Sequence, residues 1–338
     1  MRALSDARSM ASKPLQRRFF FFFSSCGKKS PEKLPTNVSG LYLELMRTSV
    51  MSQIQRSFSI ELPSLVPLQL PSRMETHLWY VVPEEVKSTS LLKQYSQLLS
   101  PSENDKVLRM RGDELQKNAL LARTLVRTTI ARYQTNNVVD PRTLMFKKNM
   151  YGKPEVDWQN YKNCDNPPLH FNISHTDSLI ACGVTVHVPV GIDLEDKERK
   201  IKHDVLPLAK RFYSADEVKF LSNIADPEVQ RKEFIKLWTL KEAYVKALGK
   251  GFSAAPFNTF TIQSKAGTTG GYNLCKEKTK KCNGEWKFGL LELADSHYAA
   301  ICIEDEQASG GGEAPLRVIV RKTIPFVEDE LISESRFL

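Results

Sequence analysis

Regular alternation of apolar and polar positions begins near residue 75 of this chain. Residues 77–82, His-Leu-Trp-Tyr-Val-Val, are rich in aromatic and β-branched side chains, a composition that predicts a strand. A helical period follows from about residue 102 to 133, with Ser102 and Asp105 expected to cap its first turn. Gly112 lies inside this period and is expected to break or kink the helix.

The rest of the chain also alternates between strands and helices. Apolar runs predict strands at residues 169–173, 179–188 and 190–194, and again at 257–262, 286–293, 298–303 and 316–320. Between these two groups, Ser214 and Glu217 form a capping box that opens a short helix. Pro227 suits the first turn of a longer helix that ends at Gly249. This order predicts an α+β protein made of two halves of similar build, joined near residues 188–191.

The first 75 residues differ from this patterned part. Residues 1–31 hold seven basic residues and one acidic residue, a composition typical of a mitochondrial transit peptide. A plastid transit peptide, or a plain tail on a cytosolic protein, is the alternative. Residues 32–75, rich in Pro, Ser and Leu, are predicted to be a poorly ordered linker. The folded part is then divided into residues 76–189 and 190–322, followed by a tail at 323–338.

Composition and charge exclude several classes of function. Of the formal net charge of +9, +6 lies in residues 1–31, so the rest of the chain gives little support for nucleic-acid binding. No run approaches the roughly 18 apolar residues that a membrane-spanning helix needs. The six cysteines form no Cys-x-x-Cys pair, and we expect reduced, buried thiols rather than zinc ligands or disulfides.

The densest group of candidate functional residues lies at residues 238–252, Trp-Thr-Leu-Lys-Glu-Ala-Tyr-Val-Lys-Ala-Leu-Gly-Lys-Gly-Phe. On a helix, positions four apart lie on nearly the same side, so Trp238, Glu242 and Lys246 form one stripe. An exposed Glu–Lys pair is the simplest interpretation of this spacing. Trp238 on the same stripe argues against a fully solvated surface.

A pair of carboxylates lies in the segment Gly191-Ile-Asp-Leu-Glu. In a strand, Asp193 and Glu195 point to one side, and their apolar neighbours point to the other. Two neighbouring carboxylates repel each other unless a proton or a cation lies between them. We therefore expect an open strand face where a hard divalent cation could bind, with a solvated pair at a strand end as the alternative.

Two further polar segments contain donors suited to an anionic ligand. Asn172-Ile-Ser174-His175 follows an apolar strand directly, where a polar turn is the simplest alternative. Residues 146–154, Phe-Lys-Lys-Asn-Met-Tyr-Gly-Lys-Pro, form a basic loop. Together with Lys106, this loop could supply charge for phosphate groups, and a solvated run of charges is the alternative.

In this order, the motifs resemble the larger, surfactin-synthetase-activating type of 4'-phosphopantetheinyl transferase over roughly residues 76–305. Gly-Ile-Asp-x-Glu, followed about fifty residues later by Trp-x-x-Lys-Glu-Ala-x-x-Lys, is the specific part of this signature. The resemblance implies a monomer of two α+β halves related by a pseudo-twofold axis. Each half would hold an antiparallel sheet packed on a long helix, with coenzyme A in the cleft between the halves.

The resemblance also implies an activity. Members of this family transfer the 4'-phosphopantetheine group of coenzyme A to a serine of an acyl carrier protein and release 3',5'-ADP. By motif, the residues that match the magnesium ligands are Asp193, Glu195 and Glu242. Lys246 matches the lysine that contacts the coenzyme phosphates. We expect Asp193, Glu242 and Lys246 to be the catalytic residues, with Glu242 as the base for the carrier serine.

Other residues match the coenzyme-binding segments of the family. These residues are Asn172, Ser174 and His175 along the coenzyme site, and Lys148, Gly152 and Lys153 around the adenine and phosphates. Lys106 matches a position that often holds arginine at the 3'-phosphate, and a lysine there loses the bidentate fork. A non-catalytic coenzyme A or nucleotide-binding module is the alternative function, which the presence of all three acids disfavours.

The partner surface is predicted from charge. Carrier proteins of these pathways are usually acidic around the modified serine, as the resemblance implies. Residues 201–221 and the preceding Lys200 combine basic and apolar side chains, namely Lys200, Lys202, Lys210 and Arg211 beside Leu206, Leu208, Phe212 and Tyr213. This segment is the predicted docking surface, with an amphipathic helix whose leucines face the core as the alternative.

Overall fold

The computed structural model describes residues 64–133, 139–158, 169–201, 204–265, 270–276, 282–305 and 314–337. The predicted transit peptide and most of the predicted linker lie outside these ranges, so both stay predictions. Within the ranges the chain is a mixed α+β protein, as the order of the predicted elements indicated. Among the helices of these ranges, none is long and apolar enough to cross a membrane.

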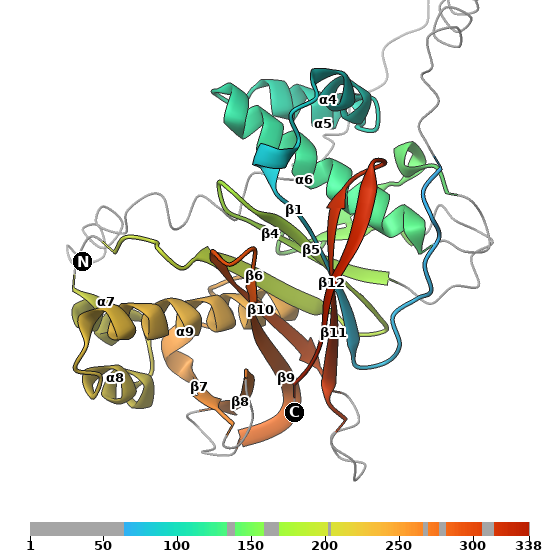
Figure 1. Ribbon diagram of the computed structural model, residues 1–338. Coiled ribbons are helices and arrows are strands. Elements are labelled where there is room, and N and C mark those ends of the chain that lie inside the picture. The colour runs from blue at the N-terminus through green and yellow to red at the C-terminus, as the bar shows by residue number, and fades with distance from the viewer. Residues whose placement is uncertain are drawn as a thin grey trace, which may run out of the picture.

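The first sheet has five strands in the order β12-β11-β1-β5-β4 (Figure 1). Its strands are β1 (Glu75–Val81), β4 (Leu169–His175), β5 (Ile180–Val186), β11 (Leu316–Ile324) and β12 (Glu328–Phe337). All neighbours run antiparallel except β1 and β11, which run parallel. The expectation of a purely antiparallel sheet is therefore wrong for this half. The long connection between β1 and β11 is what permits a parallel pair.

The second sheet has the order β6-β10-β9-β8-β7 and is antiparallel throughout. Its strands are β6 (Val190–Asp196), β7 (Phe260–Ser264), β8 (Gly271–Lys276), β9 (Cys282–Leu293) and β10 (His297–Glu304). The basic loop of the sequence forms a separate hairpin of β2 (Phe146–Lys148) and β3 (Pro154–Val156).

Within the described ranges, three α-helices precede the hairpin, namely α4 (Thr89–Ser96), α5 (Pro101–Leu108) and α6 (Asp113–Arg132). The break at Gly112 is confirmed, since this residue has a φ of 103° between α5 and α6. The predicted cap at Ser102 is wrong. Ser100 caps α5 instead, in a capping box with Glu103, because Pro101 is tolerated only in the first helical turn.

After β6, the described part of the chain contains three further α-helices, namely α7 (Val205–Phe212), α8 (Ala215–Ser222) and α9 (Pro227–Leu248). The predicted capping box of Ser214 and Glu217 opens α8, and Pro227 lies in the first turn of α9. Gly249 ends α9 in the left-handed conformation, with a φ of 63°. Short 3-10 helices lie at η1 (Pro83–Glu85), η2 (Pro141–Thr143) and η4 (Phe257–Thr259).

Hydrophobic cores join these elements into four layers. One core lies between α6 and the first sheet, a second between α9 and the second sheet, and a third between the two sheets. Alternate residues of β1 divide between them: Trp79 and Val81 belong to the core under α6, while Leu78 and Tyr80 belong to the core between the sheets. The sheets therefore pack face to face between α6 and α9.

The C-terminal residues do not form the expected tail. Residues 328–337 form strand β12, which pairs with β11 at the edge of the first sheet. Both strands therefore belong to the sheet of the N-terminal half, although the sequence division assigned β11 to the C-terminal half. The sequence of β12, Glu-Asp-Glu-Leu-Ile-Ser-Glu-Ser-Arg-Phe, lacks alternation because nearly all of it is exposed.

The cysteine prediction holds for two of the described residues. Cys182 and Cys302 are buried free thiols. Cys275 is disulfide-bonded, which contradicts the expectation of reduced thiols at this position, and it lies opposite Cys282 in the ladder of β8 and β9.

Candidate active site

Strands β4 and β6 are edge strands of the two sheets, and side chains join them. Asn172 Oδ1 accepts a hydrogen bond from the main-chain N–H of Ile192 at 2.9 Å, and Ser174 Oγ accepts one from the N–H of Leu194 at 3.1 Å. The Asn-x-Ser spacing matches the period of a strand, so both side chains point toward β6. The two side chains satisfy main-chain donors of β6 and hold this strand in place.

Helix α9 lies directly on β6 at Gly191. A Cβ atom at this position would lie 1.9 Å from the carbonyl oxygen of Ala243 and 2.3 Å from the main-chain nitrogen of Ala247. Glycine is therefore required for the main chain of the helix to approach the strand this closely. Because Gly191 and Asp193 lie on the same side of β6, the contact brings the Trp-Glu-Lys stripe of α9 over Asp193.

The stripe and the strand meet in a hydrogen-bonded group of three side chains. Lys246 Nζ donates to Asp193 Oδ1 at 2.6 Å and to Ser174 Oγ at 3.0 Å. The Ser174 hydroxyl donates to the same Asp193 oxygen at 3.1 Å. Since Ser174 also accepts from β6, its one donor and two acceptor sites are all in use. The hydroxyl thus fixes both the ammonium and the carboxylate.

Glu242 lies beside this group and is only 5% exposed. Burial raises the pKa of Glu242 well above its ordinary value, and the neighbouring carboxylate of Asp193 raises it further. The Lys246 ammonium acts in the opposite direction. Within the described residues, Glu242 Oε2 and Asp193 Oδ2 are buried without a hydrogen-bond partner. Such atoms call for a proton, a cation or a donor from a ligand.

The expected open strand face is wrong. Asp193 and Glu195 are each 5% exposed, because α9 covers this side of β6. Glu195 pairs with Arg199 at 2.7 Å, and the Arg199 guanidinium lies over the ring of Trp238, 5.9 Å from its centroid. The part of the chain that the structure describes holds no group of three or more His, Cys, Asp or Glu side chains arranged to bind a metal ion. Of the three carboxylates predicted to bind a metal, Asp193 and Glu242 have unpartnered oxygens in the described structure, whereas Glu195 pairs with Arg199.

Lys153 has a different role from the predicted phosphate ligand. Its Nζ donates to the carbonyl oxygens of Val190 at 3.0 Å, Lys246 at 2.8 Å and Ala247 at 3.4 Å. An ammonium group has three donors, so these carbonyls account for all of them. Burial, opposed in part by Glu155, lowers the pKa of Lys153 to about 8. Lys153 thus ties the hairpin to the C-terminal end of α9, where a cation is favourable.

The other predicted coenzyme residues lie near the same hairpin. Lys106 lies on α5 and Lys148 on β2, and burial, followed by the charge of Lys106, lowers the pKa of Lys148. Gly152 makes the turn of the hairpin with a φ of 94°, and His175 ends β4 opposite Ile180. The charge of Lys106 thus acts on Lys148, and their binding of a phosphate group stays a prediction.

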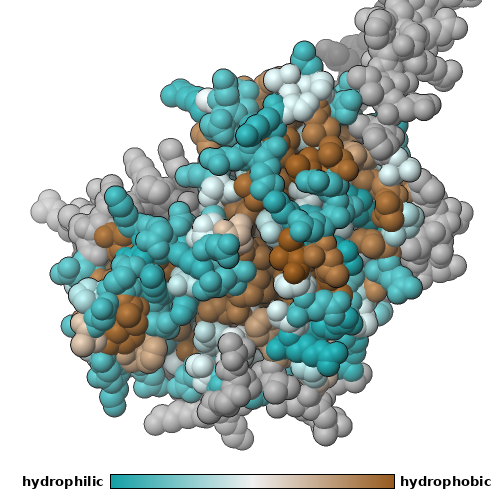
Figure 2. All heavy atoms as spheres, in the orientation of Figure 1, coloured by the Kyte–Doolittle hydropathy of each residue, from teal (hydrophilic) through white to brown (hydrophobic). Residues whose placement is uncertain are grey.

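The predicted docking segment is helical and amphipathic. Leu206, Leu208 and Phe212 pack against the second core and Tyr213 is buried, so the apolar residues face inward and not toward a partner. Lys210 and Arg211 are exposed on α7, whereas Lys202 lies outside the described residues. Apolar residues do reach the surface over α7 and α8, at the lower left of Figure 2, and Phe220 is 48% exposed.

Several residues of this region have roles that the motifs did not reveal. Asn149 donates to the carbonyl oxygen of Gly249 at 3.0 Å, while its Oδ1 accepts from the main chain of the hairpin. Lys241 forms a buried ion pair with Glu217 at 2.8 Å and donates to main-chain carbonyls near η4. Arg199 follows Glu195 by four residues, a spacing that predicts an ion pair only within a helix. Because Glu195 lies in a strand, the sequence does not reveal this ion pair.

Two segments of the chain match models of one protein family. The family model "4'-phosphopantetheinyl transferase superfamily" matches residues 189–302, and the model "4'-phosphopantetheinyl transferase, N-terminal" matches residues 87–186. Both the β6–α9 motifs and the hairpin lie within these segments. Residues 316–337, which form β11 and β12, lie beyond both matches.

Three relatives share the matched region. The 4'-phosphopantetheinyl transferase gsp of Aneurinibacillus migulanus is 37% identical over 43% of this chain and 53% of its own length. The 4'-phosphopantetheinyl transferase Sfp of Bacillus subtilis is 34% identical over 51% of this chain and 69% of its own length. HetI of a Nostoc species, with the same description, is 31% identical over 53% of this chain and 70% of its own length. The match with gsp thus spans about half of that relative.

Proposed function

Because this chain belongs to the 4'-phosphopantetheinyl transferase family, we propose that it transfers the 4'-phosphopantetheine group of coenzyme A to a serine of an acyl carrier protein. In this reaction the serine oxygen forms a bond to the phosphorus next to pantetheine. The bond from that phosphorus to 3',5'-ADP breaks, and the serine proton passes to a base. The observation that carries the proposal is the meeting of Lys246 and Glu242 with Asp193 in one buried group.

Side chains of this site suit both the departure of 3',5'-ADP and the removal of the serine proton. Lys246 supplies a fixed ammonium that can stabilise the negative charge of the departing 3',5'-ADP. Glu242 can accept the serine proton, directly or through a water molecule, and its raised pKa makes it a better base than an exposed carboxylate. Ser174 and Asp193 hold the ammonium in place through the contacts described above.

Magnesium dependence is part of the proposal. The buried, unpartnered oxygens of Asp193 and Glu242 are the hard donors that this ion prefers, and magnesium usually takes one or two carboxylates with substrate phosphate and water. Glu195, which pairs with Arg199, is a third donor by the family resemblance. When bound, the ion would neutralise charge on the pyrophosphate.

Coenzyme A would bind between the two halves, which we propose are related by a pseudo-twofold axis within a monomer. The five-stranded sheets, each packed on one long helix, support this relationship. Lys106 and Lys148 would bind a phosphate group of the coenzyme, together with His175 at the end of β4. The side chain of Lys153 would instead hold the hairpin against α9.

Mass spectrometry of the carrier tests the proposed reaction. The purified chain is incubated with coenzyme A, magnesium and an acyl carrier protein, and the carrier should gain the mass of one phosphopantetheine group. A carrier with alanine in place of the modified serine is the control and should gain nothing. A chain that binds coenzyme A but leaves every tested carrier unmodified would instead be the non-catalytic binding module. Omitting magnesium and adding a chelator tests the metal requirement separately.

A further inference from the structure

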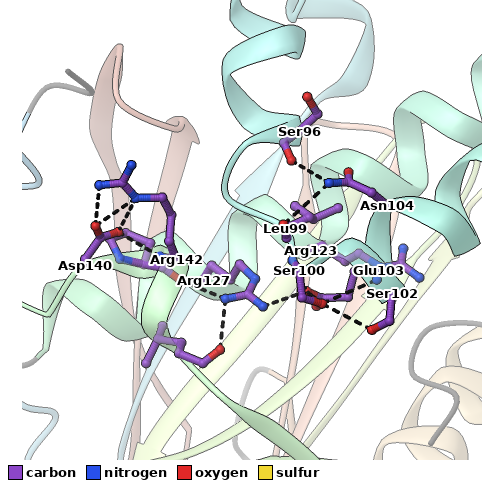
Figure 3. Close-up of polar contacts among 12 residues, drawn as sticks. Ser96, Leu99, Ser100, Ser102, Glu103, Asn104, Arg123, Arg127, Asp140 and Arg142 are labelled. Carbon is purple, nitrogen blue, oxygen red and sulfur yellow. Dashed lines mark hydrogen bonds and ion pairs between the residues drawn. The ribbon is translucent and has the colours of Figure 1, made fainter. Parts of the chain in front are cut away.

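A buried guanidinium on α6 connects several elements of the N-terminal half. Arg127 is 3% exposed, and its Nη2 donates to Glu103 Oε2 at 2.6 Å (Figure 3). Its Nη1 donates to the carbonyl oxygens of Pro141 at 2.8 Å and Leu144 at 3.0 Å. The guanidinium also lies over the ring of Phe146, 5.1 Å from the centroid. One side chain therefore contacts α5, the segment that leads into β2, and β2 itself.

Two of the elements that Arg127 contacts, α5 and β2, each carry one of the two lysines of the hairpin region. Glu103 precedes Lys106 on α5 by one helical turn. Phe146 begins β2, and Lys148 ends it. Arg127 itself is near the C-terminal end of α6, in the core of the half, so its own position is set by the buried face of that helix. The positions of both lysines thus depend on contacts with a single buried group.

Glu103 is fixed by Ser100 as well as by Arg127, through the same carboxylate oxygen. Its Oε2 accepts hydrogen bonds from the main-chain N–H and the hydroxyl of Ser100, both at 2.8 Å (Figure 3). This carboxylate therefore caps α5 and pairs with Arg127 at the same time. A charged pair of this kind is directional, because the planar guanidinium holds its partners in a fixed fork.

Lys106 and Lys148 need such support because they carry the same charge. Two positive charges repel each other, and burial, followed by the charge of Lys106, lowers the pKa of Lys148. Two flexible lysines on independent elements would move apart. Held together, they form a site for a doubly charged anion, whose binding would relieve the repulsion.

We infer that Arg127 is a positioning residue for the coenzyme, which holds α5 and β2 at the separation where Lys106 and Lys148 bind one phosphate group together. This inference rests on the proposed function and concerns a residue that does not itself touch the coenzyme. It predicts that Arg127 controls affinity for the nucleotide part of coenzyme A and leaves the transfer step unchanged.

Calorimetric titration of the full chain with 3',5'-ADP tests this inference. Arg127→Lys keeps the charge but loses the fork, so the Kd for 3',5'-ADP should rise about tenfold, as should the KM for coenzyme A. At saturating coenzyme A, kcat should stay within about twofold of the wild-type value. Glu103→Gln keeps the shape of the pair, and it should raise the same Kd by about threefold. If Arg127→Lys does not fold, Glu103→Gln carries the test.

Two comparisons separate positioning from general loss of stability. Arg132→Lys is the matched control, because Arg132 lies on the same helix, is equally buried, and pairs with Asp329 at 2.9 Å. Arg132→Lys should leave the Kd for 3',5'-ADP unchanged. In a Lys148→Gln background, Arg127→Lys should add less than about a twofold effect, because a positioning residue acts through the lysine.

The outcomes distinguish this inference from the proposed function. An unchanged Kd for 3',5'-ADP in folded Arg127→Lys and Glu103→Gln would overturn the inference alone. So would Arg132→Lys raising this Kd as much as Arg127→Lys does. So would effects of Arg127→Lys and Lys148→Gln on this Kd that are fully additive. If the wild-type chain bound neither coenzyme A nor 3',5'-ADP, the proposed function would fall and the inference with it.

Discussion

The ammonium of Lys246 lies 2.6 Å from the carboxylate of Asp193, although the two residues are 53 positions apart in the chain. This contact neutralises one oxygen of Asp193 and leaves the other, Oδ2, unpartnered within the described structure. The pair therefore stabilises a buried carboxylate while keeping one of its oxygens available to a ligand. Glu242, four residues before Lys246 on the same helix, places a second such oxygen nearby.

Removing either carboxylate should abolish transfer while the fold survives. We expect Asp193→Ala and Glu242→Ala to be inactive, also at raised magnesium concentration. Glu242→Gln should be inactive with an unchanged or higher melting temperature, because burial and the neighbouring carboxylate disfavour the charged form of Glu242.

Carrier modification and thermal melting are the measurements. Glu233→Gln, on the same helix but paired with Lys236, is the control and should keep full activity. Near wild-type turnover in both alanine variants would exclude the proposed metal ligands.

A methyl group at Gly191 should separate α9 from β6. The clash of Gly191→Ala is with main-chain atoms of the helix, so we expect a loss of about 1–3 kcal/mol or more in the free energy of unfolding, together with loss of transfer. Urea denaturation and the transfer assay measure both effects. Gly183→Ala is the comparison, because its nearest neighbour is a side-chain methyl group of Ile192 and not main-chain atoms. Equal effects of the two substitutions would argue against the close helix–strand contact.

Glu103 should make stability depend on pH in the acidic range. Burial disfavours its charged form, but Arg127 and the hydrogen bonds from Ser100 outweigh this and lower the pKa of Glu103 below its ordinary value of 4.5. A carboxylate with a lowered pKa stabilises the fold above the unfolded pKa and loses this contribution as the pH falls through the folded pKa. At pH 7, Glu103→Gln should cost about 1–3 kcal/mol of unfolding free energy.

The difference between wild type and Glu103→Gln should therefore shrink as the pH falls below 4.5. Denaturant unfolding of both proteins at pH 7 and at several values down to pH 4 measures the difference. A difference that stays constant over this range would show that the charge of Glu103 does not contribute.

Residues 1–31 should direct the protein to mitochondria and be dispensable for catalysis. A fluorescent fusion of residues 1–75 is expected to reach mitochondria, or plastids in the alternative, because residues 1–31 hold seven basic residues and a single acid. The same fusion with the basic residues replaced by glutamine should stay diffuse. A diffuse signal from the unaltered fusion would indicate a plain tail.

Reversing the exposed charges of α7 should weaken use of the carrier alone. With Lys210 and Arg211 both changed to Glu, we expect a higher KM for the carrier protein and an unchanged KM for coenzyme A. Added salt should weaken carrier use by the wild-type chain more than by the variant. If neither KM changes and salt has no effect, the carrier docks elsewhere.

The sequence by itself determined the local structure and the chemistry-bearing motifs. Ser214, Pro227 and Gly249 mark helix ends that depend on a few neighbouring residues, and the break at Gly112 follows from one residue. The stripe of Trp238, Glu242 and Lys246 and the pair of Asp193 and Glu195 follow from helix and strand periods.

Only the tertiary structure decided how these motifs meet. The approach of α9 to β6 at Gly191 buries both carboxylates, which the strand pattern alone placed in solvent. The parallel pairing of β1 with β11, the exposed strand β12, and the three carbonyl partners of Lys153 likewise depend on residues distant in the chain. Periodicity reports which side of an element is apolar, but it does not report which element covers the polar side, because that depends on long-range packing.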